Sequence, residues 1–208
     1  MKETMETKKE TKKKELCVNT KLGQMVAYTS TNPEHPGIFI DLRREGQECM
    51  APICLAEFTS DDCDSSGKIL PPSIVCRVWG DATREEYTYQ VVCRNTDEYF
   101  ADEYSGTGIT DRLAEDKKLC ANTKLGQLIA YPGGDPEYPG IYIDIKRGNA
   151  EGPVMLVEYT ATEHTPSGML PPTIISRVWG DTTDNDYTDT VISEKLEEFF
   201  ACPDGDNE

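Results

Sequence analysis

The sequence is poor in the side chains that enzymes and metal sites most often use. Its 208 residues include only two histidines, His35 and His164, and its eight cysteines show no spacing that matches a zinc site. No glycine-rich loop precedes a Lys-Ser or Lys-Thr step, which excludes the common phosphate-binding motif. Cys17 and Cys120 lie near lysines but lack a histidine partner, so we expect no nucleophile. We therefore predict that the protein is not an enzyme and uses no metal or cofactor.

Long apolar runs and positive charge are also scarce. No apolar stretch approaches the length of a membrane span, and the charged N-terminal segment lacks the apolar core of a secretory signal. Lysine and arginine number 21 against 38 acidic residues, so the formal net charge is −17. Affinity for a nucleic-acid backbone comes from basic side chains, so we expect neither direct nucleic-acid binding nor a membrane partner. The same charge favours a protein partner with a basic surface, although acidity also serves plain solubility.

The sequence does contain an internal duplication. Residues 16–101 recur as residues 119–201, most clearly in the motifs Asn-Thr-Lys-Leu-Gly-Gln and Arg-Val-Trp-Gly-Asp, which begin at Asn19 and Arg77 in the first copy. The long period indicates two similar domains, because the units of a solenoid are much shorter. The predicted segments are a disordered basic arm (1–15), the first β-domain (16–101), a linker (102–118), the second β-domain (119–201) and an acidic tail (202–208).

The duplication also bears on the cysteines. Only Cys17 has an equivalent, Cys120, whereas serines replace Cys76 and Cys93 in the second copy. A disulfide framework would be expected to recur in both copies. We therefore predict reduced thiols and a cytoplasmic location.

Each copy shows the pattern of short antiparallel strands. Over residues 38–43, the aliphatic side chains of Ile38, Ile40 and Leu42 share one face and alternate with polar or aromatic residues. Strands are expected at 24–29, 38–43, 53–59, 73–79 and 87–93 and at the equivalent positions of the second copy. Residues 97–101 and 197–201 are expected to form short helices. The predicted fold class is mostly β, with two tandem homologous antiparallel β-sheet domains, each a sandwich or partial barrel closed by a short C-terminal helix.

The Arg-Val-Trp-Gly-Asp motif is the most distinctive candidate for a binding surface. Alternation places Arg77 and Trp79 on the face opposite the predicted core, together with Phe39 and Asp41 if those strands pair. A tryptophan beside an arginine and a carboxylate has the composition of an interface hot spot. A purely structural cluster, in which the arginine stacks on the tryptophan and pairs with an aspartate, is the main alternative. The candidate partner-binding residues are Phe39, Asp41, Arg77, Trp79 and Asp81, and Tyr142, Asp144, Arg177, Trp179 and Asp181.

These observations favour a non-enzymatic, acidic protein–protein interaction module built by tandem duplication, of a kind typical of bacterial or phage accessory proteins. One alternative is a nucleic-acid mimic that inhibits a DNA- or RNA-binding enzyme, which requires a continuous stripe of carboxylates. Another is a module for carbohydrate or another ligand, which requires Trp79 and Trp179 to present exposed rings in a groove.

Overall fold

Almost all of the regular structure is antiparallel β-strand, which confirms the expected mostly β class. The computed structural model describes residues 14–46, 50–60, 66–68, 71–79, 87–93, 100, 109–161, 163–165, 168–170, 172–180 and 187–191.

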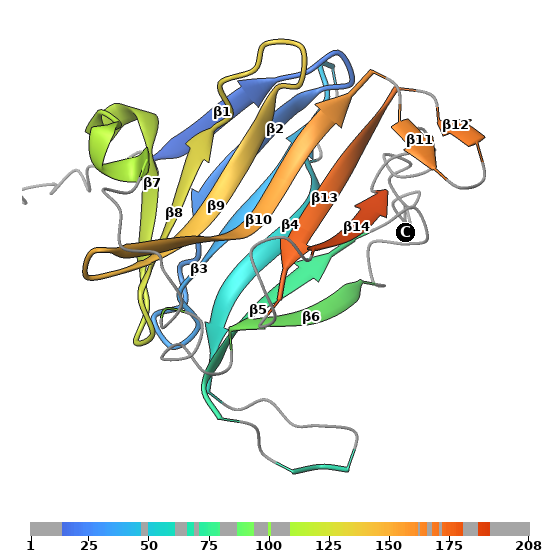
Figure 1. Ribbon diagram of the computed structural model, residues 1–208. Helices are drawn as coiled ribbons and strands as arrows, with labels where there is room; N and C mark the ends of the chain where they lie inside the picture. Colours follow the sequence, from blue (N-terminus) through green and yellow to red (C-terminus); the bar gives the residue numbers. More distant parts are fainter. Residues whose placement is uncertain are drawn as a thin grey trace, which may run out of the picture.

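The first copy forms a six-stranded sheet in which every strand pairs with the next strand along the chain (Figure 1). Its strands are β1 (Glu15–Asn19), β2 (Gln24–Thr29), β3 (Gly37–Arg43), β4 (Met50–Thr59), β5 (Ser73–Val78) and β6 (Thr88–Cys93). The strand β1 was not predicted, because it is a short edge strand with only one buried side chain, Leu16.

The second copy repeats this sheet with the same strand order. Its strands are β7 (Leu119–Asn122), β8 (Gln127–Pro132), β9 (Gly140–Arg147), β10 (Ala150–Thr160), β13 (Thr173–Trp179) and β14 (Tyr187–Val191). The polar segment between β10 and β13 contains a small unpredicted hairpin of β11 (Glu163–Thr165) and β12 (Gly168–Leu170). Between the sheets, the chain forms the 3-10 helices η1 (Ile109–Arg112) and η2 (Glu115–Lys117).

Both copies contain the same irregularity in the middle of the sheet. Pro52 of β4 lies opposite Asp41, and Pro153 of β10 lies opposite Asp144, and the register shifts beside each proline. Proline cannot donate a hydrogen bond to the ladder, so it is tolerated within a sheet mainly where a bulge interrupts the pairing. The repeated bulge shows that the two sheets share local geometry as well as strand order.

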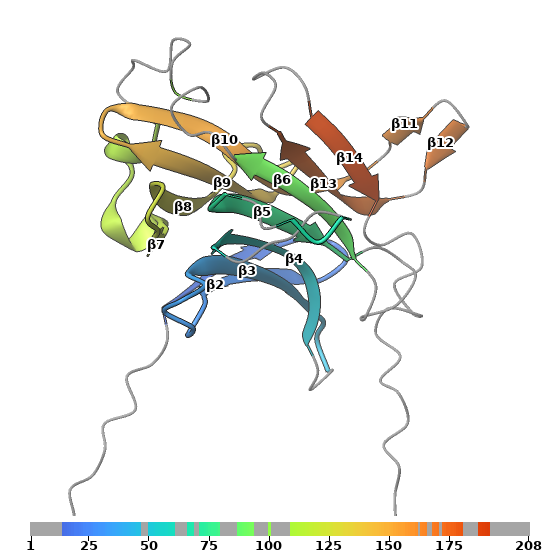
Figure 2. The same ribbon diagram turned by 90° about the horizontal axis from the view of Figure 1, so that it is seen from below.

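The two sheets pack face to face around one hydrophobic core (Figure 2). The predicted inward residues Ile38, Ile40 and Leu42 are fully buried in this core, together with Ile141 and Ile143 of the second copy. We expected a sandwich or partial barrel within each copy, but each copy instead supplies one layer of a joint sandwich. The physical reason is that a sheet with one apolar face must cover that face, and the equivalent face of the other copy is available.

Several predicted features lie outside the described residues. These include the arm up to residue 13, the tail at 202–208 and the two closing helices apart from Phe100, which lies in a turn. The described residues contain no α-helix, so a closing helix gains no support. None of the helices among them is long and apolar enough to cross a membrane.

The four cysteines with described side chains are free thiols. Cys54 and Cys76 are buried, Cys120 is half-buried and Cys17 is exposed. The side chains of the other four cysteines lie outside the described part of the chain.

Candidate partner-binding surfaces

A row of directly opposed side chains crosses the outer face of each sheet. Phe39 and Arg77 belong to the same row, as alternation predicted, but β3 and β5 do not pair because β4 lies between them. The first row consists of Tyr28, Phe39, Leu55, Arg77 and Tyr89. The second row consists of Tyr131, Tyr142, Leu156, Arg177 and Asp189. The two rows differ in kind only at the last position, where an aspartate replaces a tyrosine.

Each row begins with a stacked aromatic pair. The rings of Tyr28 and Phe39 are 5.4 Å apart and nearly parallel, and those of Tyr131 and Tyr142 are 5.5 Å apart. The hydroxyl of Tyr28 donates a hydrogen bond of 2.9 Å to Asp41. Offset stacking of this kind adds about 0.5–1.5 kcal/mol to the burial of the rings. Phe39 therefore has a structural role in addition to any contact with a partner.

Asp41 and Asp144 are buried rather than displayed to a partner. Tyr131 donates a hydrogen bond of 2.8 Å to Asp144, as Tyr28 does to Asp41. Burial raises the pKa of Asp144 to about 7, against the opposing effect of the Tyr131 hydrogen bond, and the negative charge of Glu151 raises it further. Burial also raises the pKa of Asp41. These two candidates therefore support the sheet and are poorly placed to contact a partner.

Glu151 joins the linker to this acid in the second copy. Its carboxylate accepts hydrogen bonds from the backbone N–H and the hydroxyl of Thr110 in η1. Lys146 lies 3.9 Å from Glu151 and also pairs with Asp111. The equivalent of Glu151 in the first copy is Met50, so this acid pair belongs to the second sheet alone.

An arginine is held in place near the far end of each row. Arg77 forms an ion pair with Glu57 of β4, and Arg177 forms the equivalent pair with Glu158 of β10. A structural cluster in which this arginine pairs with an aspartate is met in the second copy, where Arg177 also pairs with Asp189, whereas the motif aspartates Asp81 and Asp181 lie outside the described residues. The sequence shows this glutamate at mid-strand, yet its partner depends on the register between β4 and β5, which the sequence pattern does not reveal.

Tyrosine rings lie over these arginines. The guanidinium of Arg77 lies 5.6 Å from the ring centre of Tyr87 and 5.5 Å from that of Tyr89. Arg177 lies 5.7 Å from the ring of Tyr187. We name the set Glu57, Arg77, Trp79, Tyr87 and Tyr89 the first edge cluster, and the set Glu158, Arg177, Trp179, Tyr187 and Asp189 the second edge cluster.

The tryptophans of the edge clusters are half-buried. Trp79 packs against the hydrophobic core and meets Tyr87 at a tilted angle, with the ring centres 5.5 Å apart. Trp179 meets Tyr187 in the same way at 5.6 Å. Asp81 and Asp181, the remaining candidates, lie outside the described residues. The tryptophans thus serve partly as structural supports for the tyrosines.

The accessible aromatic side chains of the edge clusters are tyrosines that the sequence analysis missed. Tyr87 is 47%, Tyr187 49% and Tyr89 38% exposed. They lie on or beside the edge strands β6 and β14, next to the motif that was singled out. The signal for the first two was available in the sequence, because Tyr87 recurs as Tyr187 at the start of the last predicted strand.

The second edge cluster carries more negative charge than the first. Asp189 lies 3.2 Å from Nε of Arg177, so among the described residues this arginine pairs with both Glu158 and Asp189. Burial raises the pKa of Asp189, and the charge of Arg177 acts in the opposite direction. Beside this cluster is a hollow of about 350 Å³ lined by Tyr138, Tyr142, Asp135, Glu158, Arg177 and neighbouring residues.

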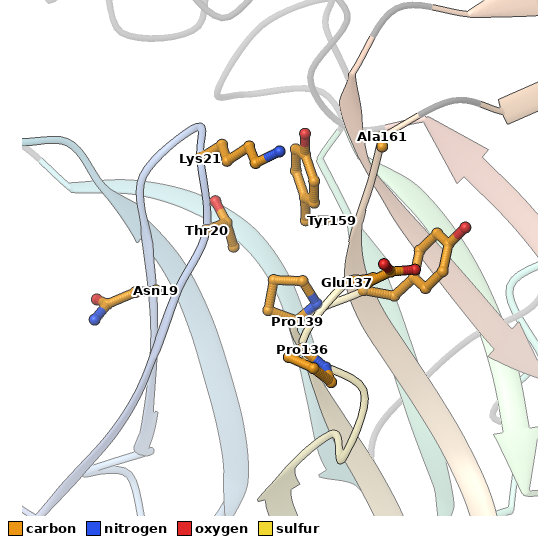
Figure 3. Close-up of a pocket in the computed structure, with 9 residues that line it drawn as sticks. Asn19, Thr20, Lys21, Pro136, Glu137, Pro139, Tyr159 and Ala161 are labelled. Carbon is orange, nitrogen blue, oxygen red and sulfur yellow. The ribbon is translucent and has the colours of Figure 1, made fainter.

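Two further clefts lie where the copies meet, and they are related by the duplication. One cleft, of about 500 Å³, lies between the β1–β2 turn and the proline-containing loop of the second copy (Figure 3). In it the amino group of Lys21 lies 5.9 Å from the ring centre of Tyr159. In the other, of about 440 Å³, Lys124 lies 5.7 Å from the ring of Phe58. Each copy therefore contacts the other through an equivalent lysine–aromatic pair.

The repeated Asn-Thr-Lys-Leu-Gly-Gln motif is explained by the turn that holds this lysine. The hydroxyl of Thr20 accepts hydrogen bonds of 3.1 Å from the backbone N–H groups of Leu22 and Gly23 and donates one of 2.7 Å to the Gly23 carbonyl. The side chains of Asn19 and Gln24 bond across the strand pair. The second copy makes the same set of bonds. Local turn chemistry thus accounts for the motif without a ligand.

Comparison of the chain with protein-family models, with curated proteins and with solved structures finds no significant match.

Proposed function

We propose that the protein is a non-enzymatic interaction protein that binds a protein partner with a basic surface through its two edge clusters. The observation that carries this proposal is the recurrence of exposed tyrosines around an ion-paired arginine on both sheets. Tyrosine, tryptophan and arginine are the residues that most often dominate the energy of protein interfaces. A cytoplasmic location is part of the proposal and is supported by the free thiols of the described cysteines.

The arrangement of each edge cluster favours binding because its arginine is already fixed. Arg77 is held by Glu57 and by the rings of Tyr87 and Tyr89, so few rotamers remain to be lost when a partner binds. The net charge of −17 would attract a basic partner over long distances and increase its association rate.

The two edge clusters are formed by different sheets, which Figure 2 shows as the two layers of the sandwich. We propose that one chain offers two partner sites, which would bridge two partner molecules. The alternatives receive less support. A nucleic-acid mimic is less well supported because Arg77 and Arg177 interrupt any stripe of carboxylates along the described rows. A carbohydrate-binding module is less well supported because Trp79 and Trp179 are half-buried and leave less ring surface for a sugar.

Affinity capture from a lysate of the native host tests the proposal. Wild-type protein and the double variant Tyr87→Ala/Tyr187→Ala are compared at low and moderate salt, with mass spectrometry of the bound proteins. Ile109→Ala provides the control, because Ile109 is an exposed apolar residue of the linker, outside the edge clusters. We expect a partner that the control retains and the double variant loses. Equal retention by both variants, or release of a nucleic-acid enzyme by salt alone, would contradict the proposal.

A further inference from the structure

The hollow next to the second edge cluster has two aromatic residues in its walls. Tyr138, in the loop before β9, is 42% exposed, and Tyr142 is half-buried on the outer face of β9. Glycines occupy two further wall positions, Gly133 and Gly134. A Cβ atom at Gly133 would lie 3.2 Å from the Tyr142 ring, so glycine permits the close approach of the loop to this ring.

Carboxylates surround this hollow in excess over cations. Asp135 and Glu158 line it, and Asp189 pairs with the one lining arginine, Arg177. Three carboxylates against one guanidinium leave a formal charge of −2. Asp135 is fixed in position, since it accepts a hydrogen bond of 2.9 Å from the backbone N–H of Glu137.

The first copy has the same framework without this chemistry. Its equivalents of Asp135 and Tyr138 are Asn32 and His35, and a serine and a threonine replace the two glycines. Only Glu57 and Arg77 remain as charged equivalents, and their charges cancel. The negative aromatic hollow is therefore a property that the second copy holds alone.

We propose that this hollow binds a basic side chain, the guanidinium of arginine or the ammonium of lysine, presented by the protein partner. The inference rests on the proposed function and names the group that anchors the partner. Aromatic faces attract cations, and an excess of carboxylates selects a cation over a neutral group of the same shape. The arginine already present does not oppose this, because its pairing with Glu158 and Asp189 neutralises its charge.

A titration of the full chain with a minimal ligand tests the inference. Backbone amide resonances of the ¹⁵N-labelled protein are followed while N-acetyl-arginine amide is added, with N-acetyl-citrulline amide as the uncharged isostere. We expect saturable shifts for residues 133–142 with a dissociation constant of about 1–10 mM, and binding of citrulline that is at least about fivefold weaker.

Two matched variants sharpen this test. Asp135→Asn removes one charge but should keep the turn, since Asn32 accepts the equivalent hydrogen bond in the first copy. We expect it to weaken arginine binding about fivefold. Asp116→Asn removes one charge from the exposed helix η2 and should leave binding unchanged.

Three results would overturn the inference: no saturable shift in residues 133–142, equal binding of arginine and citrulline, or equal weakening by the two variants. If arginine does not bind in the hollow but Tyr87→Ala/Tyr187→Ala still loses its partner, the hollow is not a cation site and the proposed function stands. Arginine binding without loss of a partner by that variant would keep the hollow as a cation site and refute the proposed role of the edge clusters.

Discussion

Replacement of the buried acid Asp144 by asparagine should change how the stability of the protein depends on pH. Asp144 is 7% exposed, accepts a hydrogen bond from Tyr131 and lies at the bulge opposite Pro153. Its pKa of about 7 in the folded protein results mainly from burial. Asparagine has nearly the same shape, keeps an oxygen that can accept the Tyr131 hydrogen bond and carries no charge.

The direction of this pH dependence follows from the number of protons bound in the folded and in the unfolded state. Between about pH 4 and pH 7 the folded protein holds a proton on Asp144 that the unfolded chain has lost, so this group makes the protein less stable as pH rises. A difference of about three pKa units corresponds to about 4 kcal/mol over the whole window, and to about 2 kcal/mol between pH 5.5 and pH 8. Asp144→Asn removes this dependence.

Urea unfolding at pH 5.5, 6.5, 7.5 and 8.5 measures the effect. We expect the free energy of unfolding of Asp144→Asn to rise relative to wild type by about 2 kcal/mol from the lowest pH to the highest. The exposed-site variant Asp116→Asn should show no such trend. A difference between Asp144→Asn and wild type that is constant across this pH range would refute the reasoning.

Other predictions concern the contacts between and within the sheets. Lys21→Met should lower the free energy of unfolding by about 0.5–1 kcal/mol in urea, because the contact with the Tyr159 ring is lost. A loss of 3 kcal/mol or more would show that Lys21 contributes more to stability than this one contact explains. Arg77→Met should cost about 2–3 kcal/mol by leaving the mostly buried Glu57 unpaired, and Arg77→Met/Glu57→Gln should recover part of that cost. A double variant less stable than the single one would contradict this. With a thiol reagent, Cys17 should react in the folded protein and Cys76 only on unfolding, since burial shields Cys76 and raises its pKa. Rapid reaction of Cys76 with the reagent in the folded protein would contradict its burial in the core.

The strands and their buried faces could be predicted from the sequence because they depend on a local pattern. Alternation over residues 38–43 identified Ile38, Ile40 and Leu42 as core residues, and all three are fully buried. The shared core could not be predicted in this way, because the same inward pattern suits a sheet covered by its own copy or by the other copy.

The candidate surface was predicted only in part, for a related reason. Alternation predicted that Phe39 and Arg77 share a face, and the pairing through Leu55 confirms it. The partners of Arg77, namely Glu57, Tyr87 and Tyr89, come from neighbouring strands. Their contact requires the register of three strands, which depends on pairing and on bulges rather than on composition.

The stoichiometry of partner binding tests the central claim most directly. Isothermal titration of the captured partner into the full chain should give two partner molecules per wild-type chain, one for either Tyr87→Ala or Tyr187→Ala, and none for the double variant. A single site per chain, or two sites that persist in the double variant, would contradict the claim that the two edge clusters bind the partner.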